Sequence, residues 1–90
     1  MTVARDVKKV VHRIDPDAEV YVFGSVVRGT FTGGSDIDIL IVTEKLKRKY
    51  DMMVEVYRRI DAPVELHIVS ERELREWYYK FIGPNEMVRV

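Results

Sequence analysis

The chain has no cysteine among its 90 residues, and this absence removes two kinds of stabilisation. Disulfide bonds and thiolate metal centres both need cysteine, so neither can form here. No apolar run approaches the roughly 18 residues of a membrane-spanning helix. The first 14 residues are charged and amphipathic, unlike a signal peptide. We therefore expect a cytoplasmic protein without a membrane partner.

Amide side chains and net charge are also scarce. Asn85 is the only amide residue and glutamine is absent, whereas Glu, Lys and Arg are frequent. This composition is typical of a thermophilic source. The 15 basic and 15 acidic residues give a formal net charge of zero. The chain as a whole therefore shows no general attraction to nucleic acids or membranes.

The length and composition predict one small globular domain over residues 1–90. Hydrophobic residues make up 47% of the chain and charged residues 33%, proportions that are typical of folded rather than disordered proteins. A domain of this size buries only about 60% of its unfolded surface. We therefore expect a thin molecule with one sheet.

The elements follow from apolar spacing, which is three to four residues in helices and two in strands. In chain order we expect a helix over 3–14, a strand over 18–24, a short helix over 25–29, a strand over 36–42, a helix over 44–60, a strand over 62–70, a helix over 71–81 opened by a Ser70–Glu73 capping box, and an edge strand or loose tail over 85–90. This order predicts an α/β (α+β) fold with one mixed sheet of three to four strands and helices packed on one face. The strands joined by the helix over 44–60 should be parallel, and the turn over 31–35 is compatible with an antiparallel pair.

Acidic residues interrupt two of these strands on one face. Alternation in the strand over 36–42 turns Ile37, Ile39 and Ile41 to one face. It places Asp36 and Asp38 on the other face, about 6–7 Å apart at the backbone. Glu65 stands in the same way in the strand over 62–70. Because charged side chains are rarely buried without a partner, and carboxylate oxygens are the ligands that Mg²⁺ and Mn²⁺ prefer, these three residues predict a metal site if the strands are neighbours.

A glycine and a serine at the end of the strand over 18–24 predict a phosphate site beside the carboxylates. Gly24 lets backbone N–H groups approach a ligand closely, and Ser25 is placed to begin the short helix, whose positive end would face the same ligand. Arg28 can add a charged fork to the phosphate oxygens.

The spacing of these residues carries a family resemblance. Gly24–Ser25, ten intervening residues and Asp36–Asp38 resemble the signature of the DNA polymerase β-like nucleotidyltransferase superfamily. The stretch GSVVRGTFTGGSDIDI is similar to the minimal nucleotidyltransferase (MNT) members, including Arg28–Gly29 after the Gly-Ser pair. The resemblance extends over about Tyr21–Val69 and implies the nucleotidyltransferase fold.

The resemblance also implies a role for each site residue. It implies two-metal phosphoryl transfer, in which Asp36 and Asp38 ligate two Mg²⁺ ions, with Mn²⁺ as an alternative. Glu65 stands where the family usually has Asp, and would complete the metal site and receive the acceptor's proton. Gly24 and Ser25 would hold the outer phosphates of the nucleotide.

The MNT members suggest an acceptor as well. They are commonly paired with a helical HEPN-type protein in toxin–antitoxin systems, in which the MNT protein adenylylates a tyrosine of the toxin. The resemblance thus implies transfer of AMP from ATP to a partner protein's hydroxyl. The alternative is a non-catalytic, nucleotide-binding antitoxin or regulatory subunit that acts by contact. A template-directed polymerase is disfavoured, because the sequence shows no basic groove.

His67, which shares a face with Glu65, is either a ligand of metal or nucleotide or a spectator. The aromatic residues of the last helix must divide between core and a protein interface, with a second copy or another protein. They are Trp77, Tyr78, Tyr79 and Phe81.

Two features of the helix over 44–60 also remain open. Its apolar residues fall at helical spacing, namely Leu46, Tyr50, Met53, Val54, Tyr57 and Ile60. The basic run over 45–49 is either a solvated helix start or a contact with an acidic partner or RNA.

Overall fold

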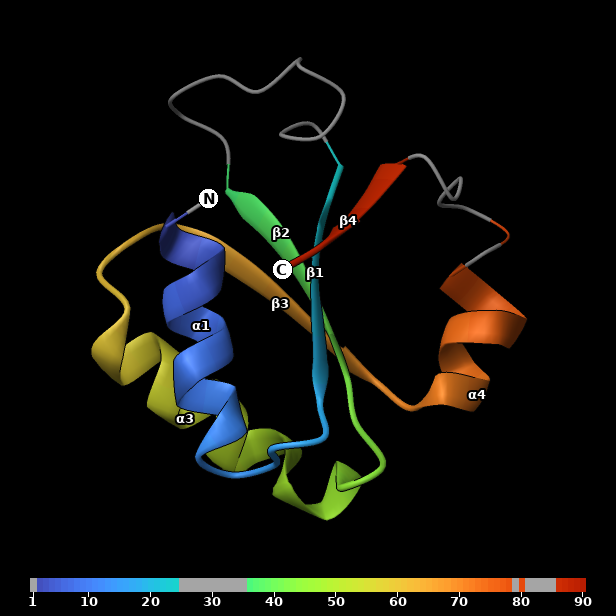
Figure 1. Cartoon of the computed structure of the whole chain (residues 1–90), viewed down its shortest axis with the longest axis horizontal. Coiled ribbons are helices and arrows are strands. Elements are labelled where there is room, and N and C mark those ends of the chain that lie inside the picture. Colours follow the sequence, from blue (N-terminus) through green and yellow to red (C-terminus); the bar gives the residue numbers. More distant parts are fainter. Residues whose placement is uncertain (1, 25–35, 79, 81–85) are drawn as a thin grey trace.

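The computed structural model describes residues 2–24, 36–78, 80 and 86–90, and it holds a four-stranded sheet (Figure 1). The strands are β1 (Glu19–Phe23), β2 (Ile37–Val42), β3 (Val64–Val69) and β4 (Met87–Arg89), in the order β3-β2-β1-β4. β2 is parallel to β3, whereas β1 is antiparallel to both β2 and β4. The predicted mixed sheet is confirmed, and the tail forms its edge strand.

The helices of the described residues follow the predicted order. They are α1 (Thr2–His12), a 3₁₀ turn η1 (Leu46–Arg48) leading into α3 (Lys49–Arg59), and α4 (Glu71–Glu73) leading into a π-helical stretch η2 (Leu74–Tyr78). The predicted capping box opens α4, because the Glu73 N–H donates to the Ser70 hydroxyl and the Glu73 carboxylate accepts from the Ser70 N–H. No helix in this part of the chain has both the length and the hydropathy needed to cross a membrane.

Several predictions fall on residues that the structure does not describe. The short helix over 25–29, with Ser25 and Arg28, lies outside the described residues, as does the turn over 31–35. The same holds for the side chains of the aromatic residues in the last helix, Trp77, Tyr78, Tyr79 and Phe81.

The main core lies between one face of the sheet and the helices α1 and α3, which lie side by side (Figure 1). Alternation in β2 turns Ile37, Ile39 and Ile41 toward these helices, as the sequence predicted. The helices contribute the buried residues Ala4, Val7, Val10, Val11, Met52 and Val56. At about 25 cal/mol per Å² of apolar surface, this burial is the main force that holds the sheet to its helices.

The opposite face of the sheet is covered only in part. Leu40, Val42 and Val69 form a second buried cluster with Leu74, at the start of η2. Figure 1 shows α4 on the other side of the sheet from α1 and α3. Two helices thus pack on one face, as predicted, and the last helix adds a contact on the other. The same strands carry their polar residues on this second face.

Candidate functional site

The register of β2 and β3 brings acidic residues from the two strands together. Asp38 is the second residue of β2 and pairs directly with Glu65, the second residue of β3. His67 follows two positions after Glu65 and therefore lies on the same face. The two strands are neighbours and run parallel, which is the arrangement that a site shared by Asp38 and Glu65 needs.

The donor atoms of Asp38, Glu65 and His67 all lie within 4.8 Å of one another. The His67 Nε2 atom is 3.8 Å from Oδ1 of Asp38 and 3.8 Å from Oε1 of Glu65. Both separations exceed a hydrogen bond. The side chains of Asp38 and His67 are each 26% exposed and that of Glu65 is 58% exposed, so the group opens to solvent on the Glu65 side.

This geometry fits a divalent cation. Ligands that each lie about 2.1 Å from one ion can be no more than about 4.2 Å apart, and both 3.8 Å separations fall within that limit. The donors of Asp38 and Glu65 lie within 4.8 Å of each other, so they need to approach by no more than about 0.6 Å to share one ion. Two carboxylates suit Mg²⁺ or Mn²⁺, and the imidazole nitrogen adds preference for a transition metal such as Mn²⁺.

An aromatic ring positions the histidine. The rings of Phe23 and His67 meet edge to face, with centroids 5.2 Å apart and planes at 65°. Such contacts stabilise a ring pair by about 0.5–1.5 kcal/mol. Phe23 is the last residue of β1 and pairs with Asp38, so the aromatic side chain reaches the site across β2. The sequence pattern does not single out Phe23, because its neighbour across the sheet depends on a register that spacing alone does not reveal.

Position 24 requires a glycine, both because of its backbone conformation and because the Asp38 side chain lies against it. Its φ is 80°, in the region that residues with a side chain rarely adopt. A Cβ atom at this position would lie 2.5 Å from Oδ2 of Asp38. From the sequence we expected Gly24 to allow the approach of a phosphate, and the structure adds the close approach of a carboxylate. Gly24 thus links the predicted phosphate turn to Asp38 of the candidate metal site.

The remaining predicted site residues are placed only in part. Asp36 is exposed and directly precedes β2, and its carboxylate is not one of the donors gathered around His67. Ser25 and Arg28 lie outside the described residues. The roles of these three residues stay predictions. His67, which the sequence left open, is brought into the group by strand alternation.

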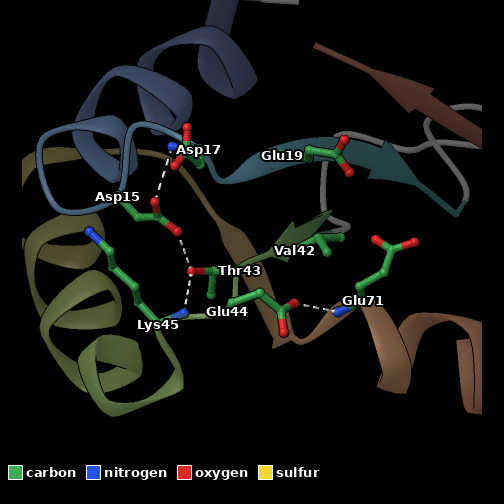
Figure 2. Close-up of a pocket in the computed structure, with 8 residues that line it drawn as sticks. All are labelled: Asp15, Asp17, Glu19, Val42, Thr43, Glu44, Lys45 and Glu71. Carbon is green, nitrogen blue, oxygen red and sulfur yellow. Dashed lines mark hydrogen bonds between the residues drawn. The ribbon is translucent and has the colours of Figure 1, made fainter.

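A second acidic region lies at the other end of β2 (Figure 2). A pocket of about 360 Å³ is lined there by Asp15, Asp17, Glu19, Val42, Thr43, Glu44, Lys45 and Glu71. Asp15 is 3% exposed, and its two carboxylate oxygens accept from the Asp17 N–H at 3.0 Å and the Thr43 hydroxyl at 2.5 Å. Asp15 therefore ties the loop after α1 to the end of β2, whereas the sequence indicated only a helix end there.

Comparison with known proteins agrees with this geometry. The family model described as a nucleotidyltransferase domain matches residues 4–89. None of the curated proteins is similar enough to this chain to match it.

Two solved structures are similar over nearly the whole chain. A crystal structure described as a "putative nucleotidyltransferase" is 32% identical, with a TM-score of 0.75 over 96% of this chain and 95% of that one. A second structure with the same description, from Sulfolobus solfataricus, is 31% identical, with a TM-score of 0.67 over 98% of this chain and 76% of that one. With its mixed sheet and its carboxylates paired across β2 and β3, the chain belongs to the nucleotidyltransferase domain family.

Proposed function

We propose that this chain transfers a nucleoside monophosphate, AMP from ATP, to a hydroxyl acceptor, which is a tyrosine of a HEPN-type partner protein. The observation that carries the proposal is the gathering of Asp38, Glu65 and His67 within 4.8 Å, in a chain of the nucleotidyltransferase family. The adenine base, the acceptor and the antitoxin role are extensions that the MNT resemblance supports.

The transfer can be written as one displacement. The acceptor oxygen attacks the α-phosphorus, the bond from that phosphorus to the oxygen bridging to the β-phosphate breaks, and pyrophosphate leaves with the bonding electrons. The hydroxyl proton passes to Glu65, which is the most exposed of the three grouped side chains and so the most accessible to an incoming acceptor. The protein's part is positioning and charge stabilisation rather than a covalent intermediate.

The site residues divide into two groups in this proposal. Asp38, Glu65 and His67 would hold one divalent ion, Mg²⁺ or Mn²⁺, and Asp36, which directly precedes β2, would serve a second ion. A bound ion supplies charge neutralisation on the phosphates. Gly24, Ser25 and Arg28 hold the outer phosphates, as the family resemblance implies.

The exposure of the site supports a macromolecular acceptor. Glu65 is 58% exposed, so a tyrosine on another protein can approach the carboxylate without displacing the core. The acceptor would enter on the sheet face opposite to α1 and α3, where Asp38 and His67 also lie.

The test uses purified protein, ATP, Mg²⁺ and a HEPN-type protein from the same genome, followed by intact-mass spectrometry. We expect the partner's mass to rise by one adenylyl group, and peptide mapping to place it on a tyrosine. Asp38→Asn should abolish the shift, whereas Asp61→Asn, an exposed acidic residue outside the grouped donors, should preserve it.

Two other outcomes would reject parts of the proposal. If the partner is neutralised without any mass change, and Asp38→Asn neutralises it equally well, the chain acts by contact and the enzymatic function is wrong. If label from ATP reaches a small molecule or an RNA instead, the transferase activity holds and the protein acceptor is wrong.

A further inference from the structure

The outer face of α3 and of the preceding turn η1 exposes four large apolar side chains, which we call the α3 face. They are Leu46, Tyr50, Val54 and Tyr57, and they are 41%, 75%, 60% and 50% exposed. The sequence placed these residues at helical spacing, yet the residues of α3 that are buried are Met52 and Val56. The helix therefore turns a different side toward the sheet and leaves this one in solvent.

The four residues form one stripe rather than scattered contacts. Tyr50, Val54 and Tyr57 follow each other at four and three residues, which places them on one side of an α-helix. Leu46 extends the stripe by a turn. Single exposed apolar residues need no explanation, but a contiguous apolar stripe is typical of an interaction surface.

The α3 face lies in a basic surrounding. Between Leu46 and Arg59 the chain has five basic and two acidic residues, although the whole chain is neutral. Both acidic residues already have basic partners on the same helix, since Arg48 bonds Asp51 at 2.6 Å and Arg59 bonds Glu55 at 2.7 Å. The Arg59 hydrogen bond also lowers the pKa of Glu55. The charge that remains unpaired on this segment is therefore positive.

A groove runs beside the stripe, between α1 and α3. It has a volume of about 420 Å³, with Val10, Ile14 and Val54 as its apolar lining. Its rim carries charged residues of both helices, namely Arg13, Arg48, Asp51 and Glu55. Val54 belongs to both the stripe and the groove. An apolar side chain laid along α3 could therefore enter the groove and place an acidic neighbour near Arg13.

We propose that the α3 face docks a partner protein through an amphipathic helix that has an apolar stripe and acidic flanks. Helix-in-groove recognition of this kind uses apolar anchors three, four and seven residues apart. The face lies on the helical side of the sheet, whereas Asp38, Glu65 and His67 lie on the other side. The docked helix therefore leaves the candidate active site open, and the proposal does not depend on the proposed function.

Charge distinguishes this partner from a second copy of the chain. In an antiparallel pair of α3 helices related by a two-fold axis, Lys47–Lys49 of one copy would face Arg58 and Arg59 of the other. Like charges in such a contact are destabilising. An acidic helix meets the same surface with opposite charge, and its association should weaken as salt rises.

The test uses a fluorescent synthetic peptide of about 16 residues, long enough to form a helix, with leucines at three- and four-residue spacing and glutamates elsewhere. We expect the peptide to bind the full chain, with amide shifts in NMR spectra centred on residues 46–59. Val54→Asp should weaken binding at least tenfold and Arg58→Glu at least threefold. The matched controls Val88→Asp and Arg72→Glu change an exposed valine on β4 and an exposed arginine on α4, and they should bind within twofold of the unchanged chain.

Three results would overturn the proposal. A peptide with lysine in place of glutamate could bind equally well, or the acidic peptide could fail to bind while circular dichroism shows the chain folded. Alternatively, analytical ultracentrifugation could show a dimer that Val54→Asp dissociates, in which case the face is covered by a second copy.

Discussion

An aspartate lies beside each end of β2, Asp38 within the strand and Asp15 in the loop after α1, and the two have opposite surroundings. Asp15, beside the end of β2, is 3% exposed and accepts hydrogen bonds at both carboxylate oxygens. Asp38, near the beginning of β2, is 26% exposed and lies 3.8 Å from the His67 nitrogen, beyond hydrogen-bond distance. A second carboxylate, Glu65, lies directly across from it on β3.

The difference separates a structural carboxylate from a candidate ligand. A buried carboxylate whose oxygens are both hydrogen-bonded has its charge compensated by the protein. Two carboxylates that face each other across a parallel strand pair repel unless a cation lies between them. The Asp38 carboxylate, paired with Glu65 and close to His67, therefore belongs to a candidate cation site, whereas the Asp15 carboxylate is held by hydrogen bonds from Thr43 and Asp17.

The largest effect should come from Asp38→Asn. Removal of one ligand charge should reduce nucleotide transfer by about a thousandfold, because a metal site supplies several kcal/mol of charge stabilisation. The melting temperature should hardly change, since Asp38 is partly exposed and stands in a repulsive group. Transfer rates and thermal denaturation measure the two effects. Full activity in this variant would remove the distinction between the two aspartates.

Asp15→Ala should show the reverse pattern. The loss of the bonds from Thr43 and Asp17 should lower the free energy of unfolding by about 2–3 kcal/mol, because it leaves buried polar groups without partners. Mn²⁺ affinity measured on the folded variant should be unchanged. Asp17→Ala is the matched control, since the exposed Asp17 contributes its backbone and not its side chain, and urea denaturation should find it near the unchanged chain.

Gly24→Ala should affect both properties. The positive φ of Gly24 costs a residue with a side chain about 1–2 kcal/mol, and the new methyl group would push against the Asp38 carboxylate. We expect lower stability together with weaker Mn²⁺ binding. A variant that loses stability but binds Mn²⁺ as before would show that Asp38 tolerates displacement and that its position is not critical.

His67→Gln should weaken Mn²⁺ binding by about tenfold and Mg²⁺ binding less, because a side-chain amide offers an oxygen in place of the nitrogen that transition metals prefer. Isothermal titration with each ion measures the two affinities. Equal affinities before and after the substitution would make His67 a spectator held against Phe23.

The smallest effect concerns Glu55, which forms an exposed ion pair with Arg59 on α3. The hydrogen bond from Arg59 lowers the pKa of Glu55 below its usual 4.5, so the pair stabilises the folded state above that pH and loses its effect as pH falls through the lowered value. We therefore expect the free energy of unfolding, measured by urea denaturation, to fall slightly less between neutral and acidic pH in Glu55→Gln than in the unchanged chain. An unchanged decrease would mean that the pair contributes nothing measurable.

Most of the correct predictions came from the alternation of side chains along the strands. It placed Ile37, Ile39 and Ile41 toward the helices and Asp38 away from them, and a connecting helix made β2 and β3 parallel. The sequence thus predicted that Asp38 and Glu65 would share a face, but it grouped Asp36 with them and left the role of His67 open. That Asp38 stands directly opposite Glu65 depends on how the loops set the strands, which local spacing does not contain.

The rest depended on tertiary packing. α3 has apolar residues around much of its circumference, so spacing alone could not decide that Met52 and Val56 would be buried and Tyr50 exposed. Leu74 completes the second buried cluster, on the face of the sheet opposite to α1 and α3, whereas the sequence predicted all helices on one face. The edge contact between Phe23 and His67 joins residues 44 positions apart in the sequence, and no local pattern links them.

Titration of the apo protein with Mn²⁺, followed by electron paramagnetic resonance of the free ion, shows whether Asp38 and Glu65 bind a cation. We expect saturable Mn²⁺ binding that Asp38→Asn and Glu65→Gln each abolish and that Asp15→Ala leaves intact. Binding that persists in both site variants, or its absence from the unchanged chain in the presence of ATP, would contradict this expectation.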